Sequence, residues 1–213
     1  MIYDNDIAKI VAKYLLQINA IILQPNNPFK WASGWNSPIY CDNRKTLSFP
    51  EIRTFIRSSL VSIINNRYKG SNVIAGVATA GIPHGALVAE ELGLPFIYVR
   101  SKAKEHGKQN QIEGHFEASQ SVVLIEDLIS SGKSSLEAVA TLREAGMNVK
   151  GIVSIFTYGF EKAKENFEDA NCEYISLCDF ENLLLQALKT SYITEAELPL
   201  LQEWRKDPSK WNK

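Results

Sequence analysis

The stretch 121–135 constrains the fold of this chain more than any other. An apolar, β-branched run leads into the adjacent acids Glu126 and Asp127, and a turn of small residues that contains Gly132 follows before a helical pattern begins at Ser134. A buried strand followed by a short turn and a helix is typical of an open α/β sheet, in which ligands bind at the carboxyl ends of the strands. The turn also places main-chain N–H groups at a helix N-terminus, where a phosphate binds readily.

Strand-like and helix-like segments alternate along most of the chain. Short apolar runs predict buried strands, and apolar residues at helical spacing predict the helices between them. The expected strands are 73–77, 96–99, 121–125, 151–157 and 173–177, and the expected helices are 6–18, 50–68, 82–92, 134–145, 160–169, 180–188 and 194–204. This alternation predicts an α/β fold with a mainly parallel central sheet flanked by helices.

The N-terminal part departs from this pattern. Segments 20–23 and 25–42 are rich in aromatic residues and turn formers, and we interpret them as two short strands joined by an irregular loop. We expect one domain, 1–213, in which residues 1–45 form a small hood, or flap, over the site. Two roles stay open for the aromatic residues of this hood, stacking on a planar heterocycle or packing within the hood, and they apply to Trp31, Trp35 and Tyr40.

Composition argues against several other functions. The net charge of −1 disfavours a broad cationic surface for nucleic acid or anionic membranes. The N-terminus carries acids where a secretory leader has basic residues, and no apolar run approaches the roughly 18 residues of a membrane span. The three cysteines lack CxxC spacing, which argues against a zinc site, and their odd number argues against a disulfide framework. We therefore expect a cytoplasmic protein without a nucleic-acid or membrane partner.

The sequence after the two acids imitates a P-loop but lacks its first glycine. Residues 131–134 are Ser-Gly-Lys-Ser, whereas the GxxxxGK[ST] pattern needs glycine at the position of Asp127. A carboxylate close to a phosphate would be repelled, so we expect Glu126 and Asp127 to face sugar hydroxyls or a divalent cation. The alternative is that one acid only caps the turn.

A basic segment, 100–111, follows the expected strand 96–99. It has no periodicity and carries four Lys or Arg residues and His106 within nine residues, which predicts an exposed loop. Such a loop can reach an anion held at a neighbouring strand and stabilise a negatively charged leaving group, although a solvated connection remains the alternative. The turn 79–81 is likewise either part of a site or an ordinary tight turn. His84 and His115 are interpreted as packing or surface residues.

Taken together, these motifs resemble those of type I phosphoribosyltransferases. Segment 122–134 is similar to their signature for phosphoribosyl pyrophosphate (PRPP), an apolar strand with two acids and a phosphate loop. Within that superfamily the chain resembles the orotate phosphoribosyltransferases. The supporting segments are 31–34, 37–42, 76–83, 100–107 and 111–114.

The resemblance implies transfer of the 5-phosphoribosyl group from PRPP to orotate, giving orotidine 5′-monophosphate and pyrophosphate in pyrimidine biosynthesis. It implies Mg²⁺ held mainly by PRPP, with no firm direct protein ligand, and a homodimer in which loop 100–115 is shared across subunits. The implied PRPP-binding residues are Thr79, Ala80, Gly81, Arg100, Lys104, His106, Glu126, Asp127, Leu128, Ile129, Ser130, Ser131, Gly132, Lys133 and Ser134. The implied catalytic residues are Lys102, Lys104, His106 and Asp127, and the implied orotate-binding residues are Ser130 and Tyr40.

Several positions differ from those of some family members. Ala32, Ala80 and Ser101 stand where those members have lysine, and the segment ending at Tyr158 lacks an arginine used near orotate. These differences leave the partner of the orotate carboxylate open. The alternatives are a phosphoribosyltransferase for another nucleobase and a non-catalytic PRPP-sensing regulator.

Overall fold

A central sheet organises the molecule. The computed structural model describes residues 1–30, 34–101 and 111–211. Its six-stranded sheet has the order β10-β9-β8-β5-β6-β7, and neighbouring strands are parallel except for the pair β6 and β7. The strands are β5 (Val73–Val77), β6 (Phe96–Val99), β7 (Ile112–Glu113), β8 (Ser121–Ile129), β9 (Asn148–Thr157) and β10 (Tyr174–Asp179). The predicted α/β fold with a mainly parallel sheet is confirmed.

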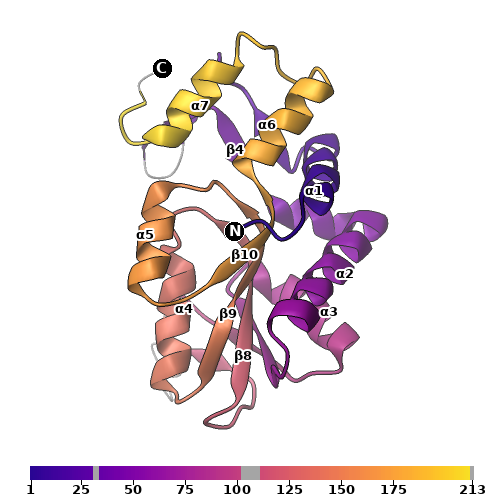
Figure 1. Cartoon of the computed structure of the whole chain (residues 1–213), viewed down its shortest axis with the longest axis vertical. Helices are drawn as coiled ribbons and strands as arrows, with labels where there is room; N and C mark the ends of the chain where they lie inside the picture. Colours follow the sequence, from indigo (N-terminus) through magenta and orange to yellow (C-terminus); the bar gives the residue numbers. More distant parts are fainter. Residues whose placement is uncertain (31–33, 102–110, 212–213) are drawn as a thin grey trace.

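Helices cover both faces of this sheet (Figure 1). Helices α4 (Lys133–Glu144) and α5 (Glu161–Asp169) bury one apolar face. The larger core lies on the other face and is formed with α1 (Asn5–Gln17), α2 (Pro50–Arg67), α3 (Gly81–Leu92) and α6 (Phe180–Lys189). Because both faces are covered, the central strands are almost continuously apolar, as expected for a parallel sheet.

The N-terminal hood contains more strands than we predicted. Strand β1 (Ile21–Leu23) pairs with β4 (Ile39–Cys41), and β2 (Phe29–Lys30) pairs with β3 (Asn36–Ser37). The prediction of two strands was wrong because a strand of two residues leaves no alternating pattern to detect. A 3₁₀ helix, η1 (Asn43–Ser48), follows and leads back to the main domain.

The C-terminal segment packs on the core. Leu201 and Trp204 are fully buried, and Trp211 joins the same cluster. Helix α7 (Leu198–Lys206) begins four residues later than the predicted start at Thr194. The expected capping pair does form, since the Thr194 N–H donates to Glu197 Oε2 at 2.9 Å, but it closes a separate turn before the helix.

Strand β8 is longer than predicted, and this places the two acids. It continues through Glu126 and Asp127 to Ile129 because β9 pairs with it up to that residue. The other neighbour, β5, pairs with β8 only as far as Ile125. The acids therefore lie within the strand, where it extends beyond β5.

Among the described residues, no helix is long and apolar enough to cross a membrane.

Candidate active site

The acid pair is held by short hydrogen bonds at the end of β8. Glu126 is 5% exposed, and its carboxyl accepts from Ser135 Oγ at 2.9 Å and from the Asp127 N–H at 3.0 Å. Burial, reinforced by the neighbouring Asp127, raises the pKa of Glu126 well above its ordinary value. Burial also raises the pKa of Asp127, and hydrogen bonding to Glu126 lowers it by a smaller amount.

The turn before α3 lies directly against these acids. A Cβ atom at Gly81 would collide with the main-chain carbonyl of Ile125, so only glycine lets the start of the helix approach β8 so closely. Thr79, Ala80, Glu126 and Asp127 accordingly line one hollow of about 320 Å³. The turn 79–81 therefore borders the hollow beside the acids, and a ligand-binding role for it stays a prediction.

The small-residue turn after β8 forms a second hollow at the N-terminus of α4. Gly132 has a φ of +77°, a left-handed conformation that glycine adopts without strain, and no side chain caps the helix. Asn166 Nδ2 donates to the Ser131 carbonyl at 2.9 Å and fixes the turn from α5. The hollow has about 300 Å³ and is lined by Ser130–Ser135, Leu128 and Glu137. Helix dipole and main-chain N–H groups make it suitable for a phosphate.

A third hollow lies between the hood and the sheet. It has about 460 Å³ and is lined by Phe29, Lys30, Tyr40, Cys41, Leu128, Ser130 and Tyr158. The rings of Phe29 and Tyr40 lie 5.6 Å apart, and Tyr40 is 39% exposed. Tyr158 is buried, and burial raises its pKa well above the ordinary value, so its phenol stays neutral. The lining is suited to a planar ring that carries polar groups.

The three hollows adjoin one another. Leu128 lines all of them, Cys41 is shared by the hollows beside the acids and beneath the hood, and Ser134 is shared by the two hollows around the acids and the phosphate turn. A single bound assembly can therefore place an anionic group, a sugar and a planar ring side by side.

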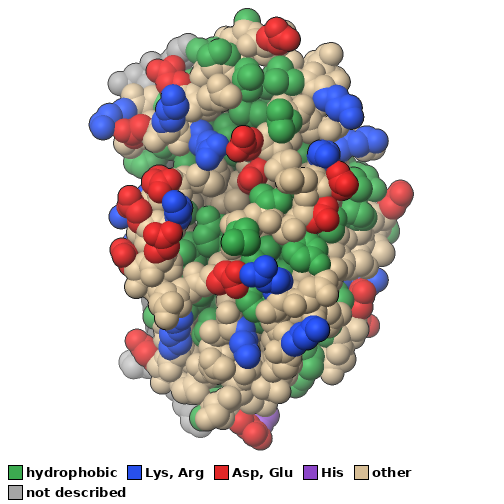
Figure 2. Space-filling model, in the orientation of Figure 1, with side chains coloured by type: hydrophobic (Ala, Val, Ile, Leu, Met, Phe, Trp, Pro, Cys, Tyr) green, Lys and Arg blue, Asp and Glu red, His purple; other side chains and the backbone are tan. Residues whose placement is uncertain are grey.

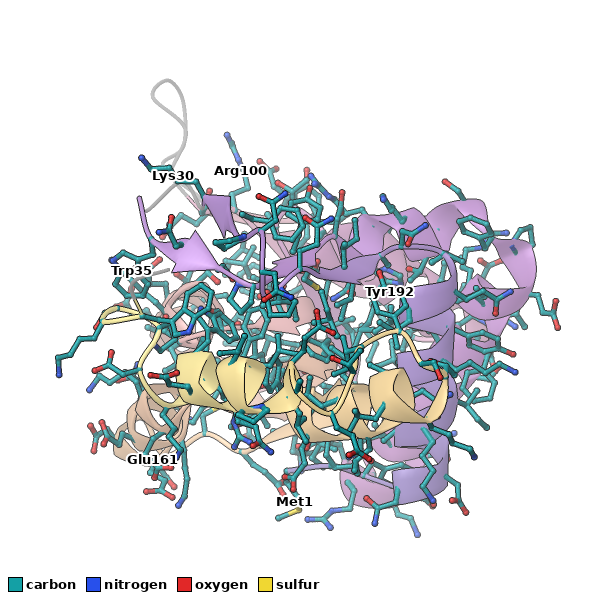
Figure 3. The ribbon with its side chains drawn as sticks, turned by 90° about the horizontal axis from the view of Figure 1, so that it is seen from above. Met1, Lys30, Trp35, Arg100, Glu161 and Tyr192 are labelled. Carbon is teal, nitrogen blue, oxygen red and sulfur yellow. The ribbon has the colours of Figure 1, made fainter. Side chains whose placement is uncertain are left out.

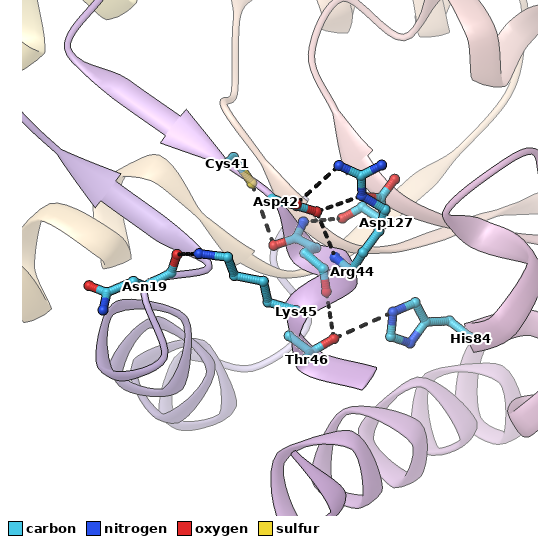
Figure 4. Close-up of polar contacts among 9 residues, drawn as sticks. Asn19, Cys41, Asp42, Arg44, Lys45, Thr46, His84 and Asp127 are labelled. Atoms are coloured by element: carbon cyan, nitrogen blue, oxygen red, sulfur yellow. Dashed lines mark hydrogen bonds and ion pairs between the residues drawn. The ribbon is translucent and has the colours of Figure 1, made fainter. Parts of the chain in front are cut away.

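Arg44 is a site residue that the sequence analysis missed. It lines the hollow beside the acids, and its Nε and Nη2 donate to the two Asp42 oxygens at 2.6 and 3.0 Å. Hydrogen bonding to this arginine lowers the pKa of Asp42. Figure 4 shows that Arg44 lies next to Asp127, whose position far along the chain gives no sequence signal for the contact. Lys30 and Asn166 were missed for the same reason.

The basic loop starts beside the phosphate turn. The Arg100 N–H donates to the Gln111 carbonyl at 2.8 Å, and Arg100 Nη1 lies 3.5 Å from Glu113 Oε1, so the two ends of the segment meet. Figure 3 shows Arg100 and Lys30 on the same side of the molecule. Lys102, Lys104 and His106 lie outside the described residues, as do Trp31 and Ala32. His84 is buried, which agrees with a packing role, and His115 is exposed.

The structure therefore brings together most of the predicted site residues. The described ones that line the three hollows are Thr79, Ala80, Tyr40, Glu126, Asp127, Leu128, Ser130, Ser131, Gly132, Lys133 and Ser134. Gly81 packs against β8 behind them, Ile129 is fully buried at the end of the strand, and Arg100 stands at the edge of α4.

The carboxyl pair is compatible with Mg²⁺ but does not form a complete protein site. Within the described ranges, no cluster of three or more His, Cys, Asp or Glu side chains could hold a metal ion. Mg²⁺ usually binds one or two carboxylates and takes its other ligands from substrate phosphates and water. Glu126 and Asp127 offer oxygen ligands of the right kind, so the residues fit an ion brought by a phosphorylated substrate.

A larger hollow lies away from this site, between α6 and α7. It has about 620 Å³, and leucines with the rim charges Glu161, Glu181, Arg205 and Lys206 line it. Figure 2 shows hydrophobic side chains gathered over these two helices with charges of both signs around them, and further hydrophobic groups over the middle of the same face. The acids that line this hollow, Glu161 and Glu181, are exposed, whereas Glu126 is buried, so we place the chemistry at the end of β8.

An acid pair on a central parallel strand, a glycine turn at a helix N-terminus and an adjoining hollow of ring size are the features expected of a phosphoribosyltransferase. Residues 49–182 match the phosphoribosyl transferase domain family. The chain is 54% identical over 203 residues to the orotate phosphoribosyltransferase of Phocaeicola vulgatus, covering 95% of this chain and 96% of that protein. It is 52% identical over 205 residues to that of Cytophaga hutchinsonii, covering 96% and 98%.

A solved structure agrees with these relatives. Orotate phosphoribosyltransferase from Aeropyrum pernix superposes with a TM-score of 0.75 at 26% identity, over 86% of this chain and 99% of that one. The chain belongs to the orotate phosphoribosyltransferase family.

Proposed function

We propose that PRPP spans the two hollows around Ser134, with its 5′-phosphate in the turn 130–134 and its ribose against Glu126 and Asp127, and that orotate occupies the hollow beneath the hood. The enzyme transfers the 5-phosphoribosyl group from PRPP to orotate and gives orotidine 5′-monophosphate and pyrophosphate. The observation that supports this placement is the meeting of the three hollows at Leu128, because a ring beneath the hood would then lie next to a sugar beside the acids.

The reaction needs stabilisation of opposite charges at adjacent positions. The bond between the anomeric carbon and the pyrophosphate oxygen breaks while the ring nitrogen of orotate bonds to that carbon and gives up its proton to solvent. Positive charge develops on the sugar, which the carboxylate of Asp127 stabilises, and negative charge develops on pyrophosphate. A Mg²⁺ ion brought by PRPP, beside Glu126 and Asp127, would supply further charge neutralisation.

Cations on two sides of the acid hollow would stabilise the leaving pyrophosphate. Arg44, oriented by Asp42, lines the hollow itself. Arg100 with Lys102, Lys104 and His106 are proposed to approach from the basic loop. Because Ala80 leaves turn 79–81 without a cation, Arg44 takes on a larger share of this role.

Lys30 is our proposed partner for the orotate carboxylate. It is the lysine among the described residues that line the hollow beneath the hood, and its four-carbon stem lets the ammonium move toward a ligand. Tyr40 and Phe29 would contact the ring, and Ser130 would hydrogen-bond its polar edge. This arrangement would supply the cation that Ala32 does not.

We also propose that the functional unit is a homodimer in the cytoplasm, with loop 100–115 of one subunit serving the site of the other. The single domain 1–213, whose hood is formed by β1 to β4 while α1 of the expected hood 1–45 packs in the main core, would then hold one complete site only in the assembly. Light scattering combined with mixing of two inactive variants, one in the loop and one at Asp127, would test this, because restored activity requires an exchanged loop.

The function is tested by incubating the protein with PRPP, Mg²⁺ and, in separate reactions, orotate, uracil or adenine while pyrophosphate release is followed. We expect turnover with orotate. Turnover with another base alone would identify a different phosphoribosyltransferase, and PRPP binding without turnover would identify a regulator. In the same assay Lys104→Ala should be severely slowed without loss of folding, and a rate near wild type would remove the loop from the mechanism.

A further inference from the structure

A buried chain of polar groups connects the hood to the acid pair (Figure 4). Asn43 and Thr46 of η1 are fully buried, and His84 of α3 is 2% exposed. Asn43 Nδ2 donates to the Asp127 main-chain carbonyl at 2.7 Å. Thr46 Oγ1 donates to the Asn43 carbonyl at 2.6 Å and lies 3.5 Å from His84 Nε2. Cys41 Sγ, which lines two of the hollows, lies 3.5 Å from Asn43 Oδ1.

The direction of these hydrogen bonds follows from their chemistry. The hydroxyl proton of Thr46 is used on the Asn43 carbonyl, so Thr46 Oγ1 can only accept from His84. The Nε2 atom of His84 must therefore carry a proton. Burial lowers the pKa of His84 to about 4, so the ring is neutral near pH 7 and contributes an N–H group without a buried charge.

The contact to Asp127 replaces a missing strand. Strand β5 stops pairing with β8 at Ile125, so the next residues of β8 have a sheet neighbour only on the β9 side. On the other side Asn43 reaches the Asp127 carbonyl across 84 positions of the sequence. A buried main-chain carbonyl without a partner is costly, and a strand end bonded on one side only has more freedom to rotate.

We propose that Asn43 is a positioning residue for PRPP: it fixes the main chain of Asp127 so that the carboxylate faces the ribose, while Thr46 and His84 fix Asn43. The proposal rests on the assignment of PRPP to the hollow beside the acids. The network would act mainly on the sugar side of the reaction, because its hydrogen bond to β8 is made to Asp127, and Cys41, which also lines the hollow beneath the hood, contacts only the side-chain oxygen of Asn43 within it.

Steady-state kinetics of two variant sets test this role. In Asn43→Leu, which keeps the volume and removes the donor, we expect kcat/KM for PRPP to fall about tenfold, equivalent to about 1.4 kcal/mol, while KM for orotate changes less than twofold. Thr46→Val should lower kcat/KM for PRPP in the same selective way but less. Thr46→Ser keeps the hydroxyl and should have a kcat/KM close to that of the wild type.

Thermal unfolding with and without PRPP shows whether a variant has lost stability, and the kinetic constants show whether it has lost the positioning of Asp127. If the variants lose stability yet keep wild-type kinetic constants for both substrates, or if both KM values rise equally, the network is structural and the proposal is wrong. A variant of Asn43 too unstable to assay leaves the Thr46→Val and Thr46→Ser pair to decide. The wild-type protein tests the proposed function in the same experiment, because absence of its orotate turnover refutes that assignment whatever the variants show.

Discussion

The two halves of the site are built in different ways. The PRPP half is formed by the end of a central strand, a glycine turn and a helix N-terminus, and its acid Glu126 is buried and hydrogen-bonded on both oxygens. The base half is formed by strands of two or three residues and by side chains such as Lys30 and Tyr40, which are exposed. In the proposed assignment, charge stabilisation at the sugar needs groups fixed before the reaction, whereas the base would be recognised by side chains that can adjust.

The largest expected effect lies in the PRPP half. Asp127→Asn keeps the size of the side chain but removes the charge that faces the developing positive charge of the ribose. We expect kcat/KM for PRPP to fall by a factor on the order of 100 or more, with binding of orotidine 5′-monophosphate retained when measured by calorimetry. Asp169→Asn, at an exposed acid of α5, serves as the control. A loss of less than threefold at Asp127 would contradict the assignment of this carboxylate.

The buried network of Asn43, Thr46 and His84 should make the free energy of unfolding depend on pH. The pKa of His84 falls from 6.5 to about 4 on folding because the ring is buried. Its contribution to stability is complete above pH 6.5 and is lost as the pH falls toward 4, up to about 3 kcal/mol. Urea unfolding at several pH values should show this slope for the wild type and a shallower one for His84→Gln. Equal slopes would mean that His84 does not titrate in this way.

The sequence predicted the PRPP half better than the base half for physical reasons. Strands 73–77 and 96–99 are continuous apolar runs, and their predicted bounds match the structure. The continuation of β8 through Glu126 and Asp127 was missed, because two acids interrupt the apolar pattern and only pairing with β9 maintains the strand. Lys30, Arg44 and Asn43 acquire their places from contacts between distant segments, which single-sequence periodicity does not contain. The catalytic roles of Lys102, Lys104 and His106 stay predictions, because these residues lie outside the described ranges.

In the base half we expect an effect on selectivity. Lys30→Met removes the proposed partner of the orotate carboxylate, so KM for orotate should rise about tenfold, while KM for PRPP stays within twofold. Uracil lacks that carboxylate, so discrimination between the two bases should fall by the same factor. Lys30→Arg keeps the charge and should restore most of the affinity. An unchanged KM for orotate in Lys30→Met would assign the carboxylate to another group.

The smallest effects distinguish main-chain from side-chain contributions within the PRPP half. Ser135 Oγ donates to Glu126 at 2.9 Å and is 1% exposed, so Ser135→Ala leaves a buried carboxyl oxygen without a donor. We expect kcat/KM for PRPP to fall about fivefold. The matched change Ser131→Ala lies in the turn itself, where main-chain N–H groups are proposed to bind the phosphate, and should cost less than about twofold. If Ser131→Ala proved the more harmful of the two, the hydroxyl groups of the turn would bind the phosphate, and the contrast with the side-chain-built base half would be lost.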